Sequence, residues 1–225
     1  MLIRPLSGGR IKQNLFGEID MKTQMRFQKI LMLVTIIVAA LSFVYALSFC
    51  SGTIYQYGTL RYTSGNRVLE RVPGAIALYD ATQLYNGILI TLSIIFIVVA
   101  ALNFIMASQK RRNYYVTNYV ATGITVVFQL VFAIILIYFL ADTLSLFNAI
   151  DKVAAEAAYR GSDLNKFKYS TVNFILGYVL TAVIVLNAVA VILNLVWKIK
   201  LMQGEKKLLA AKPVSQEEVK TEEAV

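Results

Sequence analysis

The sequence contains no histidine and only one cysteine, Cys50. Without histidine, the chain lacks the commonest general base and the commonest metal ligand. A single cysteine forms neither an internal disulfide nor a thiolate metal site, and only a disulfide to another chain stays open. The glycine-rich loops that bind phosphates or dinucleotides are also missing. We therefore expect a protein that is not an enzyme and that uses no metal and no cofactor.

Charged residues are scarce, at 16% of the chain, whereas hydrophobic residues make up 58%. Four blocks contain no charge, namely residues 30–50, 81–109, 113–141 and 169–197. A helix of about 20 residues spans a hydrocarbon core of about 30 Å, and each block is that long. Because backbone polar groups cannot stay unpaired in lipid, these blocks must be helical. The alternative is a soluble protein with four buried helices, but a soluble core does not need uncharged runs of this length.

The expected fold is an all-α integral membrane protein, a bundle of four transmembrane helices. Its membrane domain, residues 30–197, follows a basic segment, residues 1–29, of which the first 20 residues are expected to form a loosely ordered extension. The tail, residues 198–225, is expected to be disordered after about residue 212, because it is short, charged and without aromatic residues. A docking peptide is the alternative for this tail. The expected spans are about 30–50, 84–107, 115–140 and 170–197, and the outer loops are 51–83 and 141–169.

The distribution of lysine and arginine predicts the orientation of the bundle. Of the 22 such residues, fifteen lie in the two terminal segments and in the short link between the second and third helices, where Lys110, Arg111 and Arg112 are adjacent. Positive charge is retained on the cytoplasmic side, so we expect both termini and this link in the cytoplasm of a cell with the protein in its plasma membrane. The net charge of +9 then reflects topology and attraction to anionic headgroups. Nucleic-acid binding is the alternative, but the basic residues surround helix ends instead of sharing one face, and no nucleic-acid partner is expected.

The first helix ends near Cys50, as in bacterial lipoproteins that are cleaved before a cysteine. The preceding residue, Phe49, is too bulky for such a site. A cleaved secretory signal is a second alternative, but the apolar stretch is too long and the small-residue cleavage pattern is poor. We expect an uncleaved anchor.

The two outer loops have different patterns. In the first, the turn residues 64–66 predict a short hairpin, and Pro73 is expected to open a short helix through Tyr79. In the second, residues 146–160 have helical spacing with i,i+4 charge pairs, which predicts an amphipathic helix. The first loop also carries candidate contacts for an acidic or glycan ligand, with binding to lipid headgroups as the alternative interpretation. These candidate contacts are Arg61, Tyr62, Arg67 and Arg71.

Four uncharged polar residues inside the expected spans are candidate intramembrane contacts: Gln129, Asn187, Asn103 and Thr125. Gln129 lies near the middle of the third helix and Asn187 lies about 5 Å from the middle of the fourth, so we predict that the two side chains pair. In one interpretation they form hydrogen bonds between helices, worth about 0.6–2 kcal/mol each. In a second they line a polar path open to the cytoplasm, and in a third a partner subunit satisfies them.

Asn194 lies seven residues after Asn187 but about 15 Å from the middle of the membrane. At that depth, water and headgroups can satisfy a carboxamide. We therefore assign Asn194 to an interfacial anchor together with Trp197 and Lys198.

The layout of four spans with a larger first outer loop resembles claudin-like tetraspan proteins in outline. The paired cysteines and the tryptophan-rich motif of that family's first loop are missing, so nothing is carried over to this chain. The expectation is a non-catalytic accessory, scaffold or interaction subunit of a plasma-membrane assembly. Its expected partners are the lipid bilayer and either a second copy of the chain or another membrane protein. The alternative is an oligomeric pore or small-solute facilitator in which Gln129 and Asn187 line a polar path.

Overall fold

The structure is a computed structural model that describes residues 8–49, 72–108, 115–151, 153–154 and 171–210. It contains four long helices: α1 (Gly8–Phe49), α4 (Ala75–Ser108), α5 (Tyr115–Asn148) and α7 (Val172–Ala210). Each helix includes a stretch that is long and apolar enough to cross a membrane. These stretches are Thr23–Ser48, Ala75–Ser108, Asn118–Asn148 and Val172–Gly204. The prediction of an all-helical chain with four candidate membrane spans is therefore confirmed.

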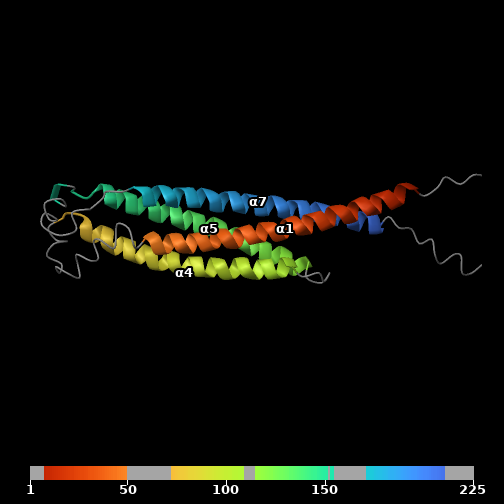
Figure 1. Ribbon diagram of the computed structural model, residues 1–225, viewed down its shortest axis with the longest axis horizontal. Coiled ribbons are helices and arrows are strands. Elements are labelled where there is room, and N and C mark those ends of the chain that lie inside the picture. The colour runs from red at the N-terminus through yellow and green to blue at the C-terminus, as the bar shows by residue number, and fades with distance from the viewer. Residues whose placement is uncertain (1–7, 50–71, 109–114, 152, 155–170, 211–225) are drawn as a thin grey trace, which may run out of the picture.

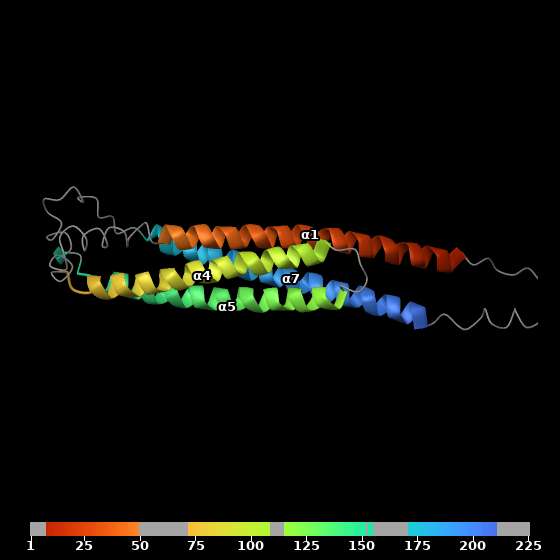
Figure 2. The ribbon, with the colours of Figure 1, turned by 90° about the horizontal axis from the view of Figure 1, so that it is seen from below.

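The four helices lie side by side and alternate in direction along the chain (Figure 1). Each helix packs against the helix that follows it in sequence, and α7 packs back against α1 to close the bundle. The helix α1 begins and α7 ends at the same end, which we call the terminal end. There, both helices project beyond α4 and α5, as Figure 2 also shows.

The inward face of each helix follows from residue spacing. On α4, the buried residues recur alternately four and three positions apart, which is the heptad spacing of helices that cross at a small angle. The large apolar residues between them are exposed on the outside of the bundle, where lipid is the solvent that suits them. The buried α4 residues at this spacing are Thr82, Asn86, Leu89, Ser93, Phe96, Ala100, Asn103 and Ala107.

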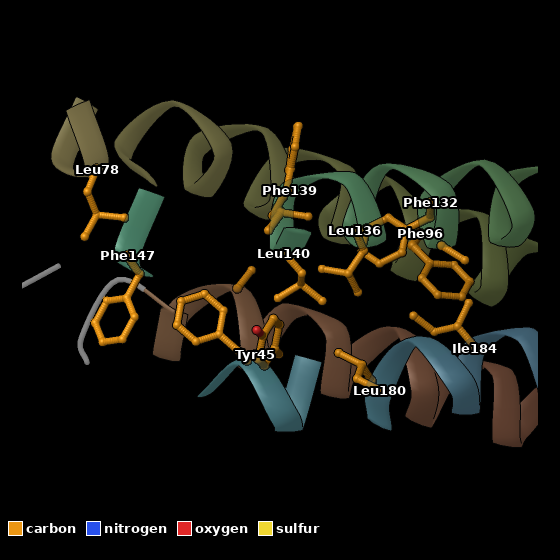
Figure 3. Packing of buried hydrophobic residues seen from close by; sticks show 14 of the residues in the cluster. Tyr45, Leu78, Phe96, Phe132, Leu136, Phe139, Leu140, Phe147, Leu180 and Ile184 are labelled. Carbon is orange, nitrogen blue, oxygen red and sulfur yellow. The ribbon is translucent and has the colours of Figure 1, made fainter. Parts of the chain in front are cut away.

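At the end opposite the terminal end, α7 approaches α1 and α5 closely. A β-carbon added at Gly177 would overlap the hydroxyl of Tyr45 and would lie 2.7 Å from Cδ2 of Leu140. The same hydroxyl donates to the backbone carbonyl of Asn173 at 2.9 Å. Tyr45 and Leu140 belong to the apolar cluster that fills this half of the bundle (Figure 3).

Several helix boundaries differ from the expected spans. The helix α1 is continuous from Gly8, so the expectation of a loosely ordered extension is wrong from that residue onward. The expected short helix after Pro73 is instead the first part of α4, which begins at Ala75 after a turn with Gly74 at a φ of 85°. Charge-free blocks underestimate helix length, because a helix satisfies its own backbone and continues outside lipid. The hairpin at residues 64–66 lies outside the described residues, as do residues 152 and 155–160 of the predicted amphipathic helix.

Candidate polar site inside the bundle

One polar residue from each helix lies at a single level of the bundle, and we call these four residues the polar tetrad: Thr35, Asn103, Thr125 and Asn187. They form two pairs between neighbouring helices. Asn103 donates from Nδ2 to Oγ1 of Thr125 at 3.0 Å, and Asn187 donates from Nδ2 to Oγ1 of Thr35 at 3.0 Å. All four side chains are buried. In each pair, two polar side chains that would otherwise face the membrane interior form a hydrogen bond between helices.

The threonines are positioned to accept these bonds. The hydroxyl of Thr35 donates to the carbonyl of Leu31, and that of Thr125 donates to the carbonyl of Ala121, each at 2.9 Å. A hydroxyl has one proton and two lone pairs, so each oxygen keeps an acceptor site for an asparagine amide. The hydrogen bond to its own helix thus orients each threonine toward the asparagine of the neighbouring helix.

A second group of polar contacts lies nearer the terminal end. Gln28 donates from Nε2 to Oδ1 of Asn118 at 3.0 Å, which joins α1 to α5. Lys198 donates from Nζ to Oε1 of the same Gln28 at 3.3 Å, which joins α7 to α1. Its ammonium also lies 5.0 Å from the ring centroid of Tyr119, at a cation–π distance. Gln28 therefore links three helices through its single carboxamide.

Asn194 belongs to this group, and its assignment to an interfacial anchor is wrong. It is 2% exposed and accepts a hydrogen bond at 3.2 Å from Nε2 of Gln24. Lys198, at 6% exposure, is also buried, whereas Trp197 remains on the surface with its ring 6.2 Å from that of Phe27. The reason is that α1 continues past the expected start of its span, so its contact with α7 extends to this level.

Gln129 differs from the other three predicted intramembrane contacts. It is 0% exposed, and neither atom of its carboxamide has a hydrogen-bond partner among the described residues. The predicted pairing with Asn187 is not formed, because Asn187 donates to Thr35 instead and its Oδ1 stays without a partner. Gln129 lies four residues beyond Thr125, which places it about 6 Å further from the terminal end.

We call the half of the bundle from the terminal end to Gln129 the polar half, because the carboxamide hydrogen bonds between helices lie there. Buried polar residues such as Ser93 and Asn86 also lie beyond it. Phe96, Phe128 and Phe132 form an aromatic cluster, in which the centroid of Phe96 lies 5.7 Å from each of the other two. Phe96 and Phe132 are fully buried beside Leu136 and Ile184 (Figure 3). These large rings close the axis of the bundle at this level. Beyond this level, Ser93 and Thr143 have unpaired hydroxyls, which can rotate toward their own backbone carbonyl one turn back, and Asn86 has an unpaired carboxamide oxygen.

The remaining predicted site residues have different outcomes. The structure brings Asn103 and Thr125 together, as described above. The candidate outer-loop contacts Arg61, Tyr62, Arg67 and Arg71 lie outside the described residues. Within the described part of the chain, no group of three or more His, Cys, Asp or Glu side chains could hold a metal ion.

Sequence reasoning did not predict Gln24 and Gln28, although both side chains form hydrogen bonds with neighbouring helices. They precede the charge-free block of α1, so a search inside that block does not include them. Their signal is spacing, because Gln24, Gln28 and Thr35 continue the three-and-four pattern of buried positions along α1.

No protein-family model, curated protein or solved structure matches this chain. The function must therefore be argued from the bundle and from the side chains inside it.

Proposed function

We propose that the chain is a non-catalytic multi-pass protein of the plasma membrane, which acts as an interaction subunit of a larger membrane assembly. The chemistry inside the bundle supports this role. Its buried amides and hydroxyls are used mainly to join helices, as in the pairs of the polar tetrad. The interior beyond Gln129 is filled mainly by aromatic and aliphatic side chains, with buried polar residues such as Ser93 and Asn86 among them. Such an interior stabilises a bundle whose outer surfaces make the functional contacts.

The projection of α1 and α7 at the terminal end carries this proposal (Figures 1 and 2). The helix α1 begins at Gly8, well before the charge-free block that starts at residue 30. Its first fifteen residues, 8–22, correspond to about 22 Å of helix. Five of these residues are charged. In the proposed orientation, with both termini in the cytoplasm, this part of α1 and the end of α7 offer a protein partner a helical surface that lipid does not cover.

The test is purification in mild detergent combined with crosslinking in the native membrane. The full chain is expected to retain a partner, which is either a second copy or another membrane protein. Deletion of residues 1–22 is expected to release that partner, whereas deletion of residues 211–225, beyond the end of α7, serves as the matched control. A chain that purifies as a monomer and forms no crosslinks in its native membrane would contradict the proposal.

A second candidate function is an oligomeric pore or facilitator for small solutes. The observation that favours it is the presence of unpaired polar atoms on Gln129 and Asn187 at neighbouring levels. In this candidate the aromatic cluster is the gate, because it closes the axis next to Gln129. Flux of small uncharged solutes into liposomes is expected to fall in the double variant Gln129→Leu, Asn187→Leu. Unchanged flux in that variant would remove this candidate.

A further inference from the structure

We propose that the polar half of the bundle is hydrated from the terminal end up to Gln129, and that the Gln129 carboxamide binds water inside the membrane. This inference goes beyond the proposed interaction role and does not depend on it. It describes a blind, water-filled site, closed by the aromatic cluster, in a bundle whose outer surface is apolar.

The first observation is the pairing state of Gln129. A carboxamide has two N–H donors and a carbonyl acceptor, and here neither its nitrogen nor its oxygen has a protein partner. The side chain is fully buried in the bundle, so it does not reach bulk water on the outside. Unpaired groups of this kind in a protein interior normally belong to a site that a bound water completes. Oδ1 of Asn187, about one turn nearer the terminal end, is a second unpaired acceptor.

The second observation is the size of the side chains at the level of Gln129 on two other helices. On α1, Ala39 follows Thr35 by four residues, and on α4, which runs in the opposite direction, Ala100 precedes Asn103 by three residues. Both are therefore close to the level of Gln129, and both are fully buried. Their methyl groups offer no hydrogen bond and occupy little volume, which favours a small polar molecule next to the carboxamide.

The third observation is a continuous polar route. The hydrogen bond between Gln28 and Asn118 fixes one level of α1 against α5. The tetrad residues Thr35 and Thr125 each lie seven residues, or two turns, further along these parallel helices. Between the two levels, the hydroxyl of Thr122 lies 3.3 Å from a side-chain oxygen of Asn118 and the same distance from one of Asn103. Each turn from Gln28 to Gln129 thus provides a polar side chain along the interior, beside a buried apolar cluster. That cluster contains Leu31, Met32, Ala107, Val126 and Val191.

The fourth observation is access from the aqueous side. A groove of 360 Å³ lies between α5 and α7 near the terminal end, lined by Tyr119, Leu195, Ile199, Met202 and Gln203. The ring of Tyr119 also contacts the ammonium of Lys198. The groove therefore adjoins the first polar contacts of the route only through Tyr119. In the proposed hydration, water enters there from the side that the charge distribution assigns to the cytoplasm.

Cysteine accessibility tests the proposal in the full chain, since Cys50→Ser removes the only natural thiol. In that background we compare Gln129→Cys with Val131→Cys, which lies on the same helix but is 48% exposed on the outside of the bundle. A second control, Leu136→Cys, lies in the apolar half, beyond the aromatic cluster. A small cationic thiol reagent added from the cytoplasmic side is expected to modify Gln129→Cys at least about tenfold faster than either control, because thiolate formation needs water. Modification no faster than at Val131→Cys would overturn the proposal.

A measurement on the unmodified side chain covers the case in which Gln129→Cys does not fold. In solid-state NMR of the chain in lipid, magnetisation is transferred from water to the side-chain nitrogen of Gln129, whose signal is identified by its loss in Gln129→Glu. Transfer to this nitrogen is expected to be several-fold faster than transfer to the methyl groups of Leu136. Equal rates at the two positions would show that Gln129 is dry and would overturn the proposal.

Discussion

Gly177 of α7 lies directly against Tyr45 of α1, so that a methyl group at position 177 would overlap the tyrosine hydroxyl. This relationship explains why the two helices come close at the end opposite the termini. Helices in membranes associate mainly through close packing, and a glycine at the contact allows the backbones to approach.

The first prediction concerns this contact. Gly177→Ala is expected to lower the free energy of unfolding by about 1–3 kcal/mol, because an added methyl group overpacks a filled interior. Gly87→Ala and Gly123→Ala are matched controls in which the added β-carbon meets nothing within 4 Å. Both controls are expected to be neutral or to stabilise by up to about 1 kcal/mol, because alanine favours the helix over glycine. Unfolding in mixed micelles with increasing denaturing detergent measures the three variants, and equal effects at all three positions would refute the close contact.

The second prediction concerns the polar tetrad. A double-mutant cycle on Asn187→Ala and Thr35→Ala is expected to give a coupling energy of about 0.6–2 kcal/mol, because the two side chains share a hydrogen bond in the membrane. A cycle on Asn103→Ala and Thr125→Ala is expected to give a similar value. The mixed cycle of Asn187→Ala with Thr125→Ala is expected to be additive within about 0.5 kcal/mol, because these side chains are not bonded to each other. Strong coupling in the mixed cycle would mean that Asn187 pairs with Thr125 and not with Thr35.

The third prediction contrasts two carboxamides that lie about one turn apart. Gln129→Leu is expected to leave the free energy of unfolding nearly unchanged, because the amide that it removes has no protein partner that would be left unpaired. Asn187→Leu is expected to lower it by about 1 kcal/mol, because it removes the bond to Thr35. The same detergent titration compares both variants. A loss of stability in Gln129→Leu equal to that in Asn187→Leu would indicate a protein partner for Gln129.

The fourth prediction concerns the junction at Gln28. Gln28→Leu is expected to destabilise the bundle by about 2–3 kcal/mol, because it removes the buried acceptor of Lys198 and the buried donor to Asn118. Arg26→Gln is the control, since Arg26 is exposed on the same helix two residues away. The control is expected to stay within about 0.5 kcal/mol of the unmodified chain. Comparable losses in the two variants would argue against a special role for Gln28.

The four helices could be predicted from the sequence because lipid allows few alternatives. An uncharged block such as residues 113–141 must satisfy its backbone internally, whatever its neighbours are. The polar contacts could not be predicted in the same way. Depth along a single helix placed Gln129 and Asn187 within one turn of each other, but a hydrogen bond also depends on which neighbouring side chain is nearer. Thr35 was nearer to Asn187, so the pairing with Gln129 failed.

Asn194 illustrates the same difficulty at the end of the membrane. Its depth predicted contact with water and headgroups, and nothing in α7 alone indicated a neighbour. The neighbour is Gln24, in a segment of α1 that charge placed outside the span. The three-and-four spacing of buried positions was the available signal, and it extends through both the charged and the uncharged parts of α1.

The uninterrupted course of α1 has a mechanical consequence. Its 42 residues form a rod of about 63 Å, and all three prolines of the chain, Pro5, Pro73 and Pro213, lie outside the four helices. A helix without proline has few places to bend. In the proposed assembly, a partner that tilts the projecting turns of α1 would therefore move Tyr45 as well, at the far end of the same rod.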